Sequence, residues 1–119
     1  RATLESVRHA IDTEDRAALM DSLILCKFLR GVFTDFYAES AEMLQKVAGW
    51  DVTAAELRQT ARRIIATKRQ VNMLAGWTPA EDTLPQRFLD TPLPSDPAAA
   101  LTRERLEELV AEYHRQRGW

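Results

Sequence analysis

This chain of 119 residues has little of what many enzymes need: one cysteine, two histidines and four glycines. A single cysteine excludes an internal disulfide, and so few Cys and His residues, far apart, exclude an ordinary zinc site. No glycine-rich phosphate loop and no glycine-flanked nucleophilic serine occur. No apolar run approaches the roughly 20 residues of a transmembrane helix. We therefore expect neither a self-contained metal site nor a membrane partner.

The charge is balanced, with a net value of -2 and both signs mixed along the chain. This argues against a dedicated nucleic-acid binder, which normally presents a strongly basic face. The basic stretch around Arg58, Arg62 and Arg63 alternates with apolar residues and has no interleaved aromatics for base stacking. We interpret it as a solvated helix face and keep nucleic-acid binding as a weaker alternative. The sparing use of cysteine favours a reducing, cytoplasmic location.

Helical periodicity runs through nearly the whole chain, and alternating β-branched runs are absent. Thr13 with Glu14 and Asp15 predicts the start of a second helix, which Gly31 would end. Thr53 and Glu56 form a capping-box pattern. Glycines predict the ends of later helices. The predicted helices cover residues 4–11, 13–31, 35–48, 53–75 and 103–116.

The stretch from residue 77 to residue 100 contains all five prolines of the chain. Proline at this density excludes a continuous helix and favours an extended segment along the surface. The sequence therefore predicts an all-α fold, a multihelical orthogonal domain of about five helices with one long proline-rich connection. We expect residues 1–119 to form a single helical domain, and the lack of an initiator Met indicates a piece of a longer protein.

The lone Cys26 has two interpretations. With Leu23, Leu25 and Phe28 as neighbours, it is typical of a small buried hydrophobe. It is also able to supply one ligand of a shared cluster, because four-thiolate clusters often combine a tight cysteine group with one distant Cys. The residues around it leave both interpretations open.

Several short motifs stand in a fixed order along the chain. The first consists of Asp21, Leu25 and Cys26, with Ile24 between them. The later ones are Gly49-Trp50-Asp51, Arg63-Ile64, Arg69, Asn72, Gly76, Asp82-Thr83-Leu84-Pro85, Arg87-Phe88 and Arg117-Gly118-Trp119. Together they resemble the C-terminal part of the tungsten-pterin aldehyde ferredoxin oxidoreductase family, whose pattern Asp-x-x-Gly-Leu-Cys has a glycine where Ile24 stands. A branched side chain at position 24 is expected to crowd a pterin or to shift the loop.

The resemblance implies a specific role for this segment. The whole enzyme would oxidise aldehydes to carboxylic acids and pass electrons through a [4Fe-4S] cluster to ferredoxin. Cys26 would be the metal ligand, and Asp21 and Leu25 would contribute to the tungstopterin or molybdopterin site. The N-terminal remainder of the polypeptide would be a partner, and a homo-oligomer is compatible with the pattern.

Other parts of the family pattern do not occur in this chain. The Cys-x-x-Cys-x-x-x-Cys motif, the first pterin motif and the catalytic acid and base belong to earlier regions of the family. We therefore assign no catalytic residue here, and we expect the isolated fragment to bind no cofactor and to be inactive. The alternative is a cofactor-free helical module, derived from the family, that serves packing or assembly.

Overall fold

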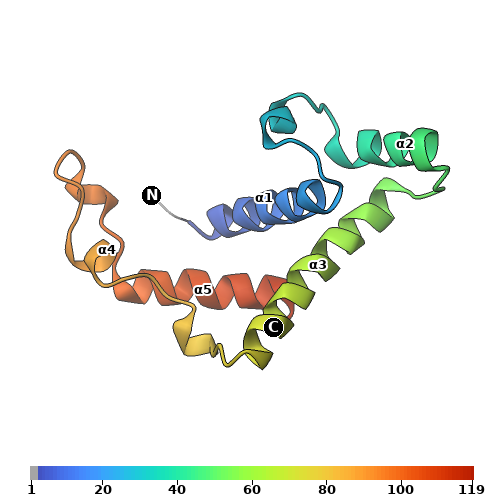
Figure 1. Cartoon of the computed structure of the whole chain (residues 1–119). Helices are drawn as coiled ribbons and strands as arrows, with labels where there is room; N and C mark the ends of the chain where they lie inside the picture. The colour runs from blue at the N-terminus through green and yellow to red at the C-terminus, as the bar shows by residue number, and fades with distance from the viewer. Residues whose placement is uncertain (1–2) are drawn as a thin grey trace. The chain divides into compact units, whose positions relative to one another are not determined.

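A computed structural model describes residues 3–119 as α-helices joined by turns and short 3₁₀ helices (Figure 1). The elements in chain order are α1 (Leu4–Ser22), η1 (Lys27–Gly31), α2 (Phe36–Ala48), α3 (Ala54–Leu74), η2 (Pro79–Glu81), α4 (Arg87–Asp90), η3 (Pro97–Ala99) and α5 (Arg103–Arg117). No β-strand occurs within these residues. The predicted all-α class with about five helices is confirmed.

The first part of the chain differs from the prediction. We expected two helices separated near Thr13, but α1 runs without a break from Leu4 to Ser22. No glycine or proline interrupts this stretch, so Thr13 continues the helix instead of capping a new one. The expected end at Gly31 is also wrong, because the helix stops at Ser22 and residues 27–31 form the separate 3₁₀ helix η1.

The later helix ends are as predicted. The Asp35 side chain accepts a hydrogen bond from the Ala38 amide at the start of α2, and Gly49 ends that helix with a φ of 69°. Thr53 and Glu56 form a complete capping box at the start of α3. Each cap satisfies backbone groups that a helix end otherwise leaves without partners.

The proline-rich connection is not the extended segment that we predicted. Between α3 and α5 the chain forms three short helices, η2, α4 and η3. Pro79 and Pro97 stand in the first turns of η2 and η3, where a missing amide hydrogen costs nothing. Prolines therefore break this stretch into single turns and do not straighten it.

Polar contacts tie the connection to α5. Trp77 Nε1 donates to one carboxylate oxygen of Asp82 at 2.8 Å, and the other oxygen lies 2.8 Å from His114 Nε2. The side chains of Asp82 and His114 are only 18% and 21% exposed. Because a partly buried carboxylate needs such partners, this network stabilises residues 77–82 against α5.

The chain divides into two compact units, residues 1–11 with 76–119 and residues 12–75, each described here by itself. The prediction of a single domain stays a prediction. The unit of residues 12–75 has a hydrophobic core from the end of α1, α2 and the start of α3. Its buried members are Leu19, Met20, Phe36, Tyr37, Ala41, Leu57 and Ala61.

The helical spacing of apolar residues predicts Met43 and Val47 on the inward side of α2, and both predictions are wrong. Met43 is 38% exposed and Val47 is 88% exposed, whereas Ser40 and Ala41 are buried. The inward face of α2 therefore centres on Phe36, Tyr37, Ser40 and Ala41, at the spacing of one helical stripe. Burial raises the pKa of Tyr37, whose ring packs edge-on against Phe36 with the centroids 5.3 Å apart.

The capping box predicts the effect of a Thr53→Ala substitution. Loss of the hydroxyl leaves the Glu56 amide without its acceptor, so the free energy of unfolding should fall by about 1 kcal/mol. Urea denaturation followed by circular dichroism measures this change. Thr67→Ala, in the exposed middle of α3, is the matched control and should be neutral or stabilising by about 0.5 kcal/mol. Equal losses in the two variants would contradict the assigned cap.

Candidate functional site

The end of α1 is a Schellman turn. The Leu25 amide donates to the Met20 carbonyl at 2.9 Å, and the Ile24 amide donates to the Asp21 carbonyl at 3.1 Å. In this motif the residue directly after the C-cap of the helix takes the left-handed conformation. Here that residue is Ile24, with a φ of 58°.

Ile24 is the one non-glycine residue with a positive φ among those the structure describes. For a β-branched residue this conformation is strained by about 1–2 kcal/mol. The backbone at Ile24 adopts a conformation that a glycine takes easily. The expectation that Ile24 crowds a pterin or shifts the loop stays a prediction. The Ile24 side chain is 91% exposed, so it leaves the core undisturbed.

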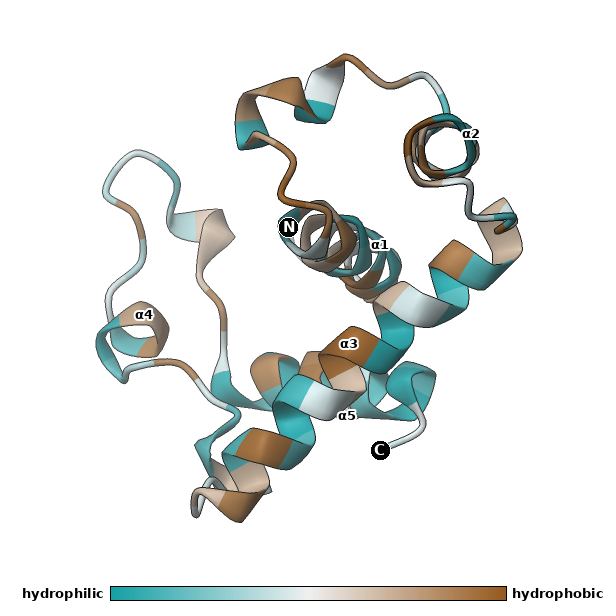
Figure 2. Ribbon diagram, turned by 45° about the vertical axis from the view of Figure 1, so that its right-hand side comes forward, coloured by the Kyte–Doolittle hydropathy of each residue, from teal (hydrophilic) through white to brown (hydrophobic). Residues whose placement is uncertain are grey.

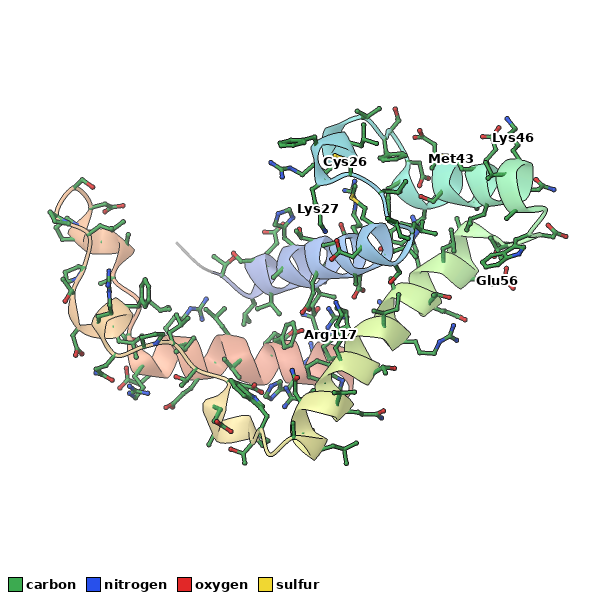
Figure 3. The ribbon with its side chains drawn as sticks, viewed as in Figure 1. Cys26, Lys27, Met43, Lys46, Glu56 and Arg117 are labelled. Carbon is green, nitrogen blue, oxygen red and sulfur yellow. The ribbon has the colours of Figure 1, made fainter. Side chains whose placement is uncertain are left out.

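The turn separates the next two side chains. Leu25 is partly buried and packs against the core of residues 12–75. Cys26 follows with extended backbone angles of φ -64° and ψ 130°, and its thiol is exposed. The interpretation of Cys26 as a buried structural cysteine is therefore wrong. Figure 3 shows Cys26 and Lys27 on the segment that follows α1.

Lys27 folds back toward the end of α1. Its ammonium lies 2.9 Å from the Asp21 carboxylate and donates to the Ala17 carbonyl at 3.1 Å. The Asp21 side chain is 57% exposed. Asp21 is thus held at the surface, two helical positions before the turn, with one oxygen engaged by Lys27.

Exposed apolar side chains follow Cys26 along the chain. Phe28 is 94% exposed, Val32 is 68% exposed and Leu29 is 41% exposed. Figure 2 shows much of the segment between α1 and α2 in the colour of hydrophobic residues. Water contact with several large apolar groups on one short segment is unfavourable, and such patches mark interaction sites.

Metal ligands other than Cys26 do not gather near the thiol. Within residues 3–119, no group of three or more His, Cys, Asp or Glu side chains is placed to hold a metal ion. A single exposed thiol is able to supply one ligand of a cluster whose other ligands come from another segment. It does not form a complete ligand set by itself. Nor does any helix of the described residues combine the length and apolar character needed to cross a bilayer.

The arginines of the basic stretch on α3 make contacts within the chain. The Arg58 guanidinium lies 4.3 Å from the centre of the Tyr37 ring. Arg62 Nε lies 3.9 Å from buried Asp15, and Arg63 donates to Thr60 at 3.3 Å. These contacts engage the three cations that the weaker nucleic-acid hypothesis would need for phosphate groups.

Sequence reasoning missed two features of this region. It did not predict the ion pair between Lys27 and Asp21. It also missed that Arg16 and Arg30, far apart in sequence, line one pocket with Lys27. The spacing of opposite charges in the sequence was the available signal for the ion pair. The pocket had no such signal, because it depends on where η1 lies relative to α1.

Comparison with known proteins decides the family. The family model described as "Aldehyde ferredoxin oxidoreductase, domains 2 & 3" matches residues 2–119. The chain belongs to this family. It is 37% identical to the "Tungsten-containing aldehyde ferredoxin oxidoreductase" of Pyrococcus furiosus and to that of Thermococcus kodakarensis, over 117 residues in each case. Identity to the protein of the same name from Pyrococcus horikoshii is 36%.

The matches cover 97% of this chain but only 19% of each of these relatives. No solved structure matches the chain significantly. The resemblance in the motifs around Asp21 and Cys26 is thus confirmed at the level of the family, whereas the roles of Asp21, Leu25 and Cys26 stay predictions.

The strained turn predicts the effect of an Ile24→Gly substitution. Relief of the left-handed strain exceeds the extra entropy that glycine has in the unfolded chain. The free energy of unfolding should therefore rise by about 0.5–1 kcal/mol, as measured by denaturant titration. Ile24→Val keeps the branched carbon and should stay within about 0.5 kcal/mol of the parent. If glycine destabilised the chain, position 24 would not be left-handed.

Proposed function

We propose that this chain is the part of a tungsten- or molybdenum-pterin oxidoreductase that supplies one thiolate to a [4Fe-4S] cluster and one side of the pterin site. The whole enzyme oxidises an aldehyde with water to a carboxylic acid, which releases two protons and two electrons. The electrons pass to ferredoxin. The acid and base of this reaction come from parts of the polypeptide outside this chain, which spans 19% of its relatives.

The observation that carries the proposal is the exposed Cys26 directly after the Schellman turn. A lone structural cysteine is usually buried, whereas a ligand shared with another segment has to face outward. The turn supports this role because it fixes the backbone on the N-terminal side of the thiol. Leu25, packed on the core, anchors the same point.

Each site residue has a distinct task in this proposal. Cys26 holds one iron through its thiolate. Asp21 accepts hydrogen bonds from N–H groups of the pterin ring, and Lys27 orients the Asp21 carboxylate through their 2.9 Å contact. Leu25 shapes the edge of the pocket. When bound, the cluster supplies one-electron transfer and the metal-pterin supplies the oxidation chemistry.

The exposed apolar side chains that follow Cys26 in the chain support a covered site. Phe28, Leu29 and Val32 are exposed here, and the N-terminal remainder of the polypeptide would cover them. That contact would exclude water from the thiolate and lower the local dielectric constant, which tunes the redox potential of a cluster. In this proposal the enzyme acts in the cytoplasm, and the isolated segment is inactive.

A cofactor-free module for packing or assembly is the second candidate. The observation that favours it is Ile24, whose exposed branched side chain stands where the family pattern has a glycine. The two candidates differ in metal content. The natural polypeptide, purified without oxygen, should contain about four irons and one tungsten or molybdenum if the enzyme proposal is right. A colourless, metal-free polypeptide would support the packing module.

Cys26→Ser tests the thiolate. In the full polypeptide a hydroxyl replaces the iron ligand with a much weaker one, so iron and sulfide content and the visible absorbance of the cluster should fall by half or more, roughly. Ser22→Ala is the matched control: it removes only a hydroxyl that donates to the Ala18 carbonyl, and its iron content should be unchanged. Full iron content and full activity in Cys26→Ser would refute the ligand assignment.

Asp21→Asn tests the pterin contact. The amide keeps the shape of Asp21 but loses the negative charge and one acceptor, so tungsten or molybdenum content should fall while iron content stays. Asp12→Asn is the control, because it makes the same charge change at an exposed position of α1 outside the proposed site. Metal analysis of both variants distinguishes loss of the pterin contact from a general effect of charge. An equal loss of tungsten in both would refute the pterin contact of Asp21.

A further inference from the structure

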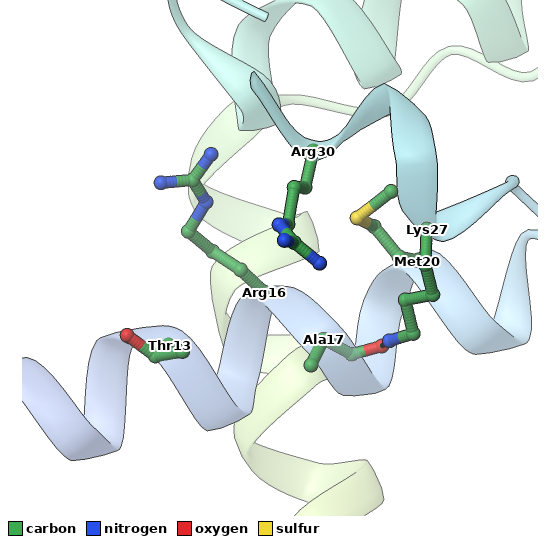
Figure 4. A pocket seen from close by; sticks show the side chains of 6 residues that line it. All are labelled: Thr13, Arg16, Ala17, Met20, Lys27 and Arg30. Carbon is green, nitrogen blue, oxygen red and sulfur yellow. Dashed lines mark hydrogen bonds between the residues drawn. The ribbon is translucent and has the colours of Figure 1, made fainter. Parts of the chain in front are cut away.

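A pocket of about 170 Å³ lies between α1 and η1 (Figure 4). Its lining residues are Thr13, Arg16, Ala17, Met20, Lys27 and Arg30. Arg30 extends from η1 toward α1, between Arg16 and Lys27. A cavity of this volume equals about five or six water molecules at 30 Å³ each, so it suits a small ion or a small polar group.

The charges of the pocket are not balanced. Three of its lining side chains are cations, and none is a carboxylate. Asp21 engages Lys27 from outside the lining. Among the residues that the structure describes, neither Arg16 nor Arg30 forms an ion pair. Two guanidinium groups that line one pocket without a carboxylate repel each other, so an anion in the pocket would stabilise both.

The geometry points to a phosphate group, and we propose that this pocket binds one, free or on a small ester. Arginine presents N–H donors in a planar fork that matches two oxygens of a phosphate. Three cations from different directions suit a tetrahedral dianion better than a planar carboxylate, which one guanidinium can satisfy. Thr13 and Ala17 complete the lining on the side of α1.

The pocket is partly preorganised for this ligand. The Arg16 guanidinium lies 5.5 Å from the centre of the Phe36 ring, a core residue that restricts its motion. The Lys27 ammonium is held by the Ala17 carbonyl and by Asp21. Donors fixed in advance lose less entropy on binding. The site uses neither Cys26 nor a cofactor and shares only Lys27 with the proposed pterin site, so variants of Arg16 and Arg30 test it separately from the proposed enzyme function.

Calorimetric titration of the full polypeptide tests the pocket. Inorganic phosphate, glycerol 3-phosphate and acetate are titrated separately, with chloride keeping the ionic strength constant. We expect saturable binding of a phosphate compound and none of acetate. Tighter binding of inorganic phosphate identifies the free ion as the ligand, and tighter binding of glycerol 3-phosphate identifies an ester.

Variants assign the binding to this pocket. Arg30→Gln should weaken phosphate binding about tenfold or more, since it removes a charge-assisted contact. Arg30→Lys keeps the positive charge but loses the planar, two-pronged guanidinium group, so its affinity for phosphate should lie between those of the parent and Arg30→Gln. Arg63→Gln makes the same charge change at an exposed position of α3 outside the pocket. Its affinity for phosphate should stay within about twofold of the parent, because no charge-assisted contact to the ligand is lost.

Circular dichroism checks that these variants fold, and Arg16→Gln gives a second, independent position in the pocket. Three results would overturn the proposal: no saturable phosphate binding, acetate binding as tight as phosphate binding, or equal weakening by Arg30→Gln and Arg63→Gln.

Discussion

The left-handed turn at Ile24 is the constraint on which the candidate site depends. Two hydrogen bonds to α1 close the turn, and the positive φ of 58° sends the chain away from the helix axis. As a result, Leu25 packs on the core while Cys26 faces outward. A helix that continued past Ser22 would carry the thiol around the helix surface, and the alternation of one buried and one exposed side chain would be lost.

The same turn brings basic groups together. Because η1 folds back beside α1, Lys27 reaches Asp21 and Arg30 faces Arg16 across a small pocket. The region around the thiol thus combines an oriented carboxylate, exposed apolar side chains and two arginines without ion-pair partners among the described residues. Such a surface is costly in a protein that presents it to water alone. Its composition is typical of a surface that binds ligands or another part of a protein.

Local signals predicted much of the fold. Thr53 with Glu56 marked the start of α3, and Gly49 marked the end of α2, because caps depend on a few neighbouring residues. The break expected at Thr13 was wrong, since a capping residue also fits inside a helix when its neighbours are good helix formers. Val47 was placed inside by its apolar character, yet no partner element covers that side of α2 among the described residues.

The sequence by itself determined the all-α class, most helix ends and the family motif around Asp21 and Cys26. Those features follow from short-range hydrogen bonding and from residue order. Only the tertiary structure decided that Cys26 is exposed, that Ile24 is left-handed and that Arg16 and Arg30 share a pocket. Exposure depends on which surfaces the packed core leaves uncovered, and the pocket depends on the path of residues 23–31. Neither can be read from local propensity, because both arise from contacts between segments distant in sequence.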